Sequence, residues 1–307
     1  RVLFRSVLFG NAVRRAARNL GFAKPVMWIF LPTGAYALSA IRSAAIVYHC
    51  VDEYAGNVGV DAAAVETLEQ ELLRRVDIVF ATSRPLADRL AAHHEHVLCV
   101  PNTAETERFR HSSPPPPEMQ ELTHPVIGYV GNLANFKIDA GLIRAVTNAR
   151  PDWTFVFVGP TGVGDPSTSS GFVTGPNVHL LGPRRYETIP RYVASFDVCI
   201  LPFANNRVTR GSLPLKSIEY LAAGKPVVST PLPSLLAEPL RECISFAAEP
   251  DAFVACIERA LRTDSRAESE KRRALADRYS WDRRFPEISS AVQHCLAGRD
   301  RDLPREA

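Results

Sequence analysis

The chain lacks the patterns that mark several common classes of protein. None of its apolar runs reaches the roughly 18 residues that a membrane-spanning helix needs. No Gly-Lys-Ser/Thr follows a glycine-rich turn, and neither G-x-S-x-G, H-E-x-x-H nor a paired-carboxylate catalytic pattern occurs. The sequence therefore carries no signature of a membrane-spanning protein, a P-loop nucleotidase, a serine hydrolase or a zinc protease.

Paired cysteines are also missing. No C-x-x-C spacing occurs, although His49 stands beside Cys50 and His294 beside Cys295. Most of the cysteines lie in apolar runs, so we expect reduced core residues in a cytoplasmic protein and no metal site. The six are Cys50, Cys99, Cys199, Cys243, Cys256 and Cys295.

Acidic residues are absent from the first 51 positions. This segment interleaves its cations with apolar residues such as Leu3, Phe4, Leu8 and Phe9. Two interpretations remain open: a solvated helix whose apolar face meets the core, or a segment that lies on an anionic membrane surface at the inner face of the membrane. The seven basic residues are Arg1, Arg5, Arg14, Arg15, Arg18, Lys24 and Arg42.

Short continuous apolar runs alternate with segments of helical period throughout the chain. This alternation is typical of a parallel sheet covered on both faces. We predict an α/β fold of two doubly wound domains that face each other across a cleft. The first clear strand, at 26–31, follows a helix, so we expect the first domain to be incomplete at its N-terminal edge. The other predicted strands begin or end near Ile46, Asp77, Val97, Val130, Trp153, Val178, Asp197, Val227 and Cys243.

Four consecutive prolines in HSSPPPPEMQ suggest the domain boundary, because such a run fits neither a helix nor a central strand. We predict a first domain at 1–112, a stiff linker at 113–123 and a second domain at 124–280. Residues 281–307 are predicted to form a helix that returns toward the first domain, followed by a tail. The segment 160–177, rich in Gly, Ser, Thr and Pro, is predicted as a mobile surface loop.

The stretch SLPLKSIEYLAAGKPVVST, at 212–230, predicts a helix with defined ends. Ser212 is a candidate N-cap, Pro214 suits the first turn, and Gly224 ends the helix. The apolar residues recur at helical spacing, which leaves Lys216 and Glu219 on another face. A helix N-terminus followed by a carboxylate suits a nucleotide, because amides meet phosphate and the carboxylate accepts from ribose. The alternative is an exposed Lys-Glu pair on a surface helix.

A second candidate site element is GYVGNLANFK, at 128–137. Gly131 allows close approach of the backbone to a ligand, and Lys137 precedes a predicted helix, where a cation suits a diphosphate. A β-turn with an exposed lysine explains the same residues. Arg207, Arg210 and Lys216 add three cations near one strand end.

In the first domain, His49 and Asp52 end a predicted strand and are candidates for the acceptor side. Such residues also occur as turn formers or as satisfied polar groups, and that reading stays open.

Five segments together resemble the family-4 retaining glycosyltransferases of the GT-B fold, and most closely the bacterial branch that makes exopolysaccharide or teichuronic-acid-type polymers. The resemblance runs from about Pro25 to Trp281. It implies transfer of a hexose from a nucleoside-diphosphate sugar to a lipid-linked or glycan acceptor, with retention of configuration and without a metal or other cofactor. The segments are LLRRVDIVFATSRPLADRL, VPNTAETERF, IGYVGNLANFK, FDVCILPF and PLKSIEYLAAGKPVVST.

The resemblance also implies roles for single residues. Glu219 matches the family's ribose-binding glutamate, and Lys137 matches its diphosphate-binding lysine. Lys137 and Arg210 would stabilise the leaving group and are the catalytic candidates. The donor-binding set is Gly131, Asn132, Lys137, Ser212, Leu213, Pro214, Leu215, Lys216 and Glu219.

Four positions depart from the family pattern. Gly211 stands where a glutamate usually holds the donor sugar, and Asn132 replaces a phosphate-binding arginine. The usual His-Asp pair falls on Val51-Asp52, and Asn102-Thr103 replaces an Asn-Gly hinge. These departures leave two alternatives to a glycosyltransferase: a non-catalytic or truncated nucleotide-sugar binder, or an epimerase of the same fold. No reading includes a nucleic-acid partner.

Overall fold

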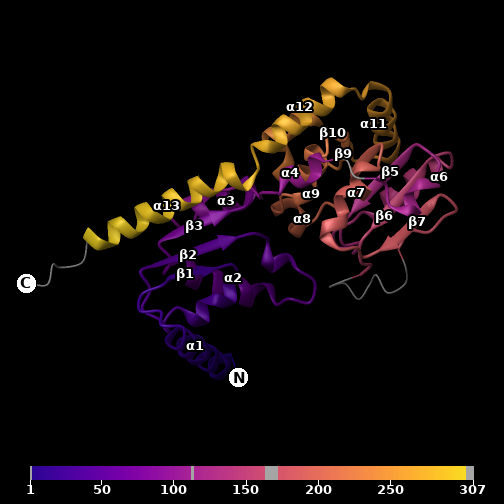
Figure 1. Ribbon diagram of the computed structural model, residues 1–307. Coiled ribbons are helices and arrows are strands. Elements are labelled where there is room, and N and C mark those ends of the chain that lie inside the picture. The colour runs from indigo at the N-terminus through magenta and orange to yellow at the C-terminus, as the bar shows by residue number, and fades with distance from the viewer. Residues whose placement is uncertain (1, 112–113, 163–171, 302–307) are drawn as a thin grey trace, which may run out of the picture. The chain divides into compact units, whose positions relative to one another are not determined.

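The computed structural model describes residues 2–111, 114–162 and 172–301, with side chains from 8 to 297 in these ranges. The chain forms two compact units, Arg1–Pro101 with Phe285–Ala307, and Asn102–Arg284 (Figure 1). The units divide between Pro101 and Asn102, before the predicted linker.

The first unit contains a four-stranded parallel sheet in the order β1-β2-β3-β4. Its strands are β1 (Val26–Ile29), β2 (Ala45–Cys50), β3 (Ile78–Ala81) and β4 (Val97–Cys99). Leucines of α2 and α3 cover one face, and Ile288 of α13 packs on Val47, Ile78 and Phe80 of the other. The helices are α1 (Val2–Asn19), α2 (Ala62–Leu73), α3 (Arg84–Ala91) and α13 (Trp281–Arg301), with 3-10 turns η1 (Pro32–Ala37) and η2 (Tyr54–Gly56).

The second unit is a six-stranded parallel sheet in the order β10-β9-β8-β5-β6-β7. Its strands are β5 (Val126–Val130), β6 (Thr154–Val158), β7 (Val178–Gly182), β8 (Val198–Leu201), β9 (Val227–Ser229) and β10 (Ile244–Phe246). Its helices are α4 (Thr106–Arg110), α5 (Pro117–Gln120), α6 (Ala140–Ala149), α7 (Ile189–Ala194), α8 (Arg207–Gly211), α9 (Leu215–Ala222), α10 (Pro233–Leu236), α11 (Pro250–Thr263) and α12 (Arg266–Asp277), with 3-10 turns η4 (Tyr186–Thr188) and η5 (Pro239–Cys243).

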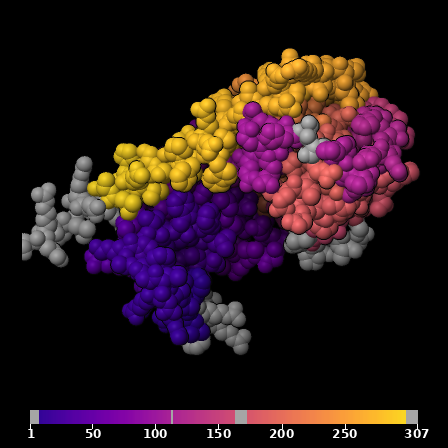
Figure 2. All heavy atoms as spheres, in the orientation of Figure 1, coloured from indigo at the N-terminus to yellow at the C-terminus, as the bar shows by residue number. Residues whose placement is uncertain are grey.

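Helices cover both faces of this sheet. Side chains of α6 and α11 pack on one face, and those of α7, α9 and α12 pack on the other. Helix α12 also packs on α9, and its opposite side forms part of the molecular surface (Figure 2).

The same aspartate contact occurs in both sheets. Asp77 precedes β3, and its carboxylate accepts a hydrogen bond from the amide of Ile46 in β2 at 2.7 Å. Asp197 precedes β8 and accepts from the amide of Val126 in β5 at 2.6 Å. Each carboxylate satisfies an N–H at the start of the neighbouring strand and helps to fix the strand register.

Most helix ends follow the sequence signals. Asp61, Ser83, Asp139 and Ser265 cap α2, α3, α6 and α12 by accepting a backbone N–H. Gly224, whose φ is +77°, ends the helical segment that contains α9, as predicted. The prediction that Ser212 caps α9 is wrong: the N-cap of α9 is Pro214, and Ser212 ends α8 instead.

The prediction that 113–123 is a free extended linker is also wrong over its described part. Pro117 begins the short helix α5, which is possible because a first-turn proline has no N–H to lose. Met119 is buried in the core of the second unit, and Arg191 donates to the carbonyl of Pro114 at 2.8 Å. The proline run therefore lies on the second unit.

Residues 163–171 of the predicted loop 160–177 lie outside the described residues. On its C-terminal side, Phe172 and Val173 are buried in the core beside Phe157, so this part is not a surface loop. All six cysteines are free thiols, but only Cys50, Cys199 and Cys256 are buried as predicted, and the other three are half-buried. In the described ranges, no helix combines the length and apolar character of a membrane span.

Candidate functional site

The order of the second sheet reverses between β5 and β8. From β5 the chain builds outward to β6 and β7, and from β8 it builds the other way to β9 and β10. In open parallel sheets, ligands bind beyond the carboxyl ends of the strands at such a switch point. The loops that follow β5 and β8 are therefore the first place to look for a site.

These two loops are joined by hydrogen bonds. The amide of Ala204 donates to the carbonyl of Lys137 at 2.9 Å, and the side chain of Asn206 donates to the carbonyl of Phe136 at 2.6 Å. The amide of Asp139 donates to the carbonyl of Pro202 at 2.8 Å. These bonds join the loop that carries Lys137 to the loop that carries Asn206. The side chain of Asn206 also caps α8.

Gly131 sits in a backbone conformation that only glycine adopts readily, with φ +154°. Its carbonyl lies so close to Gly159 that a Cβ on Gly159 would approach it to 1.9 Å. The two glycines let the ends of β5 and β6 approach each other. The glycine at 131 is therefore required by the fold itself, whatever else it does.

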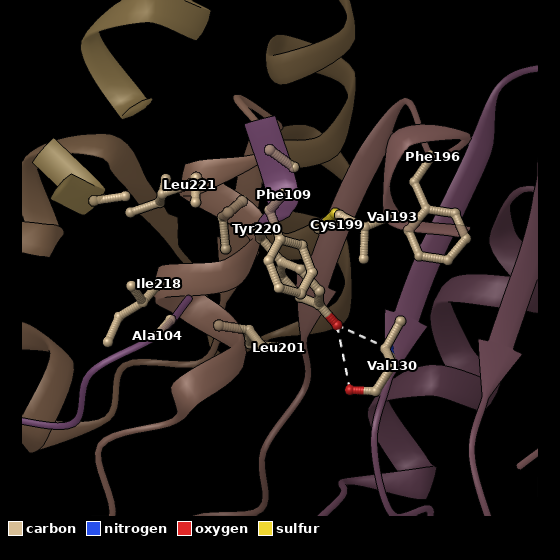
Figure 3. Packing of buried hydrophobic residues seen from close by; sticks show 14 of the residues in the cluster. Ala104, Phe109, Val130, Val193, Phe196, Cys199, Leu201, Ile218, Tyr220 and Leu221 are labelled. Atoms are coloured by element: carbon tan, nitrogen blue, oxygen red, sulfur yellow. Dashed lines mark hydrogen bonds between the residues drawn. The ribbon is translucent and has the colours of Figure 1, made fainter. Parts of the chain in front are cut away.

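Helix α9 is fixed to the end of β5 by Tyr220. The buried tyrosine hydroxyl accepts from the amide of Val130 at 2.7 Å and lies 3.4 Å from the carbonyl of the same residue (Figure 3). The predicted apolar face is confirmed, because Ile218 and Leu221 are in the core (Figure 3), as is Ala222. This contact sets the distance between α9 and the loop that carries Lys137.

The segment Ser212–Leu215 enters α9 under tight restraint. Asn102 donates to the carbonyl of Leu213 at 2.7 Å, and Ser234 donates to the carbonyl of Ser212 at 2.7 Å. Helix α9 has no side-chain cap at its N-terminus. The amide of Ser217 donates to the carbonyl of Pro214 at 3.0 Å, and the other first-turn amides are thus available to an anion, which the helix dipole favours there.

Glu219 is fully buried, with 0% of its surface exposed. One carboxylate oxygen accepts from the hydroxyl of Tyr186 at 3.1 Å, and the other pairs with the Lys216 ammonium at 2.8 Å. The interpretation of an exposed Lys-Glu pair is therefore wrong. A buried carboxylate must have its charge compensated, and Lys216, with 24% of its side chain exposed, provides the cation.

Tyr186 is the site residue that sequence reasoning missed. Its ring lies edge-on to Phe109, and the Arg108 guanidinium lies over it at 5.5 Å. Burial, reinforced by the negative charge of Glu219, raises the pKa of Tyr186, so that the hydroxyl stays protonated and donates. Position 186 follows β7, far from Glu219 in sequence, and carries no motif that links the two.

Lys137 is half-buried and its ammonium lies 5.6 Å from the ring of Phe136. No carboxylate in the described part of the chain pairs with it. Arg210 is exposed and donates to Asn205 at 2.7 Å, and Arg207 is exposed on the same short helix. The predicted gathering of three cations is incomplete, because the charge of Lys216 is compensated by Glu219.

The two acceptor-side candidates belong to the first unit. His49 lies inside β2 among the rings of Trp28, Phe30 and Phe80. Burial lowers its pKa to about 4, so it is neutral at pH 7. Asp52 is half-buried just after β2, and its carbonyl accepts from the amide of Tyr54.

The second unit therefore brings together a lysine without a carboxylate partner, uncapped helix amides and a buried carboxylate. Cations and amides suit a diphosphate, and a carboxylate suits sugar hydroxyls. Asn132, half-buried beside Gly131, offers an amide rather than a cation. Within the described ranges, no three His, Cys, Asp or Glu residues are grouped to hold a metal ion.

Comparison with known proteins fits this geometry. Residues 124–263 match the family described as Glycosyl transferases group 1. One relative, from Bacillus subtilis (strain 168), bears the name teichuronic acid biosynthesis glycosyltransferase TuaH. It is 28% identical to this chain over 280 residues, which are 85% of this chain and 70% of the relative.

Solved structures share the fold at low identity. Anabaena Alr3699/HepE, solved in complex with UDP, has a TM-score of 0.72 at 18% identity and covers 93% of this chain and 82% of its own. Sucrose-phosphate synthase from Thermosynechococcus elongatus has a TM-score of 0.72 at 18% identity and covers 94% and 78%. The predicted GT-B class, with two parallel-sheet α/β domains, is confirmed.

Proposed function

Because the chain carries a glycosyl transferases group 1 domain at residues 124–263, we propose that it transfers a sugar from a nucleoside-diphosphate sugar bound by its second unit. The observation that carries the proposal is the switch point between β5 and β8. There, Lys137 and the uncapped amides of α9 provide an anion site, and Tyr220 fixes the helix that carries Glu219. The solved complexes of HepE with UDP and with UDP-glucose support this donor class.

The proposed chemistry is departure of the nucleoside diphosphate. Negative charge grows on the leaving oxygens as the glycosidic bond breaks, and a fixed cation stabilises that charge most in the transition state. Lys137, in the loop that follows β5, provides one such cation. Arg210 is exposed and held by a single neutral partner, so it can turn toward the same oxygens.

Retention of configuration and independence of metal are part of the proposal, and they rest on the family resemblance. Retention requires the acceptor to attack from the face that the leaving group vacates. A reaction that needs no metal keeps its rate in excess EDTA, and NMR of the first-formed product reports the anomeric configuration.

The acceptor is proposed to be lipid-linked or glycan, with the first unit at an anionic membrane surface. Arg15 and Arg18 of α1 are exposed, as are the neighbouring apolar residues Leu8, Phe9 and Leu20. An apolar groove of about 600 Å³ runs between α1 and β1. Cations beside exposed apolar groups favour binding to anionic lipid. The side chains of residues 1–7, which include Leu3, Phe4 and Arg5, lie outside the described residues.

A non-catalytic nucleotide-sugar binder is the second candidate, because Gly211 and Asn132 stand where the family has a glutamate and an arginine. The two candidates share the donor site and differ in turnover. A thermal-shift screen of UDP-, GDP- and ADP-sugars tests the shared site: a ligand at 100 times its Kd adds about 2.7 kcal/mol to the apparent stability. No stabilisation by any of them would remove both candidates.

A further inference from the structure

Glu219 cannot contact a ribose in the arrangement described above. No part of Glu219 is exposed to solvent, and Tyr186 and Lys216 each hydrogen-bond to one of its carboxylate oxygens. Each oxygen has a further lone pair, but neither is exposed, so a ribose hydroxyl reaches the carboxylate only where one of these two partners moves aside. Lys216 compensates the buried charge, and its removal would leave the carboxylate without a cation. Tyr186 contributes a neutral hydroxyl, which a ribose hydroxyl can match.

Tyr186 is also the partner that can move. It lies in a run of exposed residues at 183–187, and none of the three residues of η4 is buried. The tyrosine itself is 37% exposed, whereas Lys216 is 24% exposed and belongs to α9. Arg108 lies over the face of the Tyr186 ring, and Phe109 meets the ring edge-on. The hydroxyl end of the ring is the part that contacts Glu219.

We propose that Tyr186 sets the affinity for the donor by occupying the position on Glu219 that a ribose hydroxyl takes in the complex. Donor binding then exchanges one hydroxyl for another on the same carboxylate oxygen. The inference rests on the proposed function, since it assumes that Glu219 accepts from ribose.

The exchange predicts an unusual sign for Tyr186→Phe. Phenylalanine keeps the ring but leaves one oxygen of a buried carboxylate without its donor in the free protein, which raises the free energy of that state. In the complex the ribose hydroxyl supplies the donor. The variant should therefore bind UDP about tenfold more tightly than the wild type, and its melting temperature should fall only without ligand.

The matched control is Tyr192→Phe. The Tyr192 hydroxyl also donates to a glutamate, Glu118, at 2.6 Å in the same unit, but it is not bonded to Glu219. Calorimetric titration with UDP, or with GDP or ADP if the thermal screen selects that base, gives Kd for each protein. Titration with the 2′-deoxy and 3′-deoxy forms of the same nucleotide identifies the hydroxyl, since the form that lacks it should gain nothing from Tyr186→Phe.

The outcomes are distinct. Tighter binding by Tyr186→Phe alone, lost with one deoxynucleotide, supports the exchange. Unchanged or weaker binding overturns it, as does equal tightening by Tyr192→Phe or by both deoxynucleotides. If Glu219→Gln binds the nucleotide as well as the wild type, Glu219 does not accept from ribose and the exchange fails, whereas the proposed function fails only if the wild type binds no sugar nucleotide. If Glu219→Gln loses binding and Tyr186→Phe does not gain it, only the role of Tyr186 fails.

Discussion

The environment of Glu219 in the structure differs from the solvated helix face that its sequence pattern suggests. In the sequence it is one half of an i, i+3 pair with Lys216, a pattern that usually belongs to a solvated helix face. In the structure its carboxylate is closed off from solvent and bonded to two side chains. Burial of a charge is costly, and it is found where the charge has a specific partner or task.

Replacing Glu219 by glutamine tests this task. The substitution keeps the shape and removes the charge that strengthens a hydrogen bond from ribose, so donor binding should weaken by about 1.5–3 kcal/mol. Calorimetric titration gives Kd. The matched control is Glu121→Gln, an exposed carboxylate that precedes β5. A folded Glu219→Gln variant with the donor Kd of the wild type would show that this carboxylate does not bind the donor.

Lys137 should act on rate more than on binding. Its cation has no carboxylate partner among the described residues, so it is available to the charge that develops on the leaving diphosphate. Lys137→Ala should lower kcat by about 100-fold or more, by comparison with loss of one oxyanion donor. Initial-rate kinetics separate the parameters. A raised KM with an unchanged kcat would make Lys137 a ground-state binder.

The sequence predicted these residues but not their surroundings. Lys137 and Glu219 are candidates from the sequence because each lies beside a glycine turn or a helix start, which are local signals. Tyr186 was missed because its link to Glu219 is a tertiary contact between segments that share no pattern. The loop bonds of Asn206 to Phe136 were missed for the same reason.

At the scale of elements, the contact of Tyr220 with β5 holds the candidate site together. Its hydroxyl meets both the amide and the carbonyl of Val130 inside the core. Tyr220→Phe should lower the free energy of unfolding by about 1–3 kcal/mol, because it leaves buried backbone groups unsatisfied. Urea denaturation measures the loss. A change below about 0.5 kcal/mol would show that the contact does not hold α9 to the sheet.

Strands and long helices were predicted well because their signals are periodic and local. The parallel order follows from continuous apolar runs, which only a sheet covered on both faces explains. The errors lie where short-range rules compete. Serine is a common N-cap residue, but Ser212 is the C-cap of α8, so it ends one helix and does not start the next. The proline run resembles a linker, but Met119 packs into the core and holds it on the second unit.

At the scale of the whole molecule, the cations of α1 predict attachment to anionic lipid. Arg14 donates to the carbonyl of Ala40, whereas Arg15 and Arg18 are exposed. Each cation near such a surface contributes about 1 kcal/mol, so replacing both Arg15 and Arg18 by serine should weaken binding by about 2 kcal/mol at low salt. Co-sedimentation with anionic and neutral vesicles measures it.

The control for the membrane prediction is the pair Arg74→Ser and Arg75→Ser, which removes the same charge from exposed positions after α2. Equal binding to both kinds of vesicle would contradict the prediction, as would equal losses in the two double variants. In either case α1 would be an ordinary surface helix.

We propose that the second unit binds a sugar nucleotide and that Lys137 promotes loss of its diphosphate. The most direct measurement is release of nucleoside diphosphate from UDP-, GDP- and ADP-sugars, with and without a lipid-linked or glycan acceptor, by the wild type and Lys137→Ala. We expect release from one donor that rises with acceptor and falls about 100-fold or more in the variant. A donor that binds but is released intact, or equal release by both proteins, would contradict the claim.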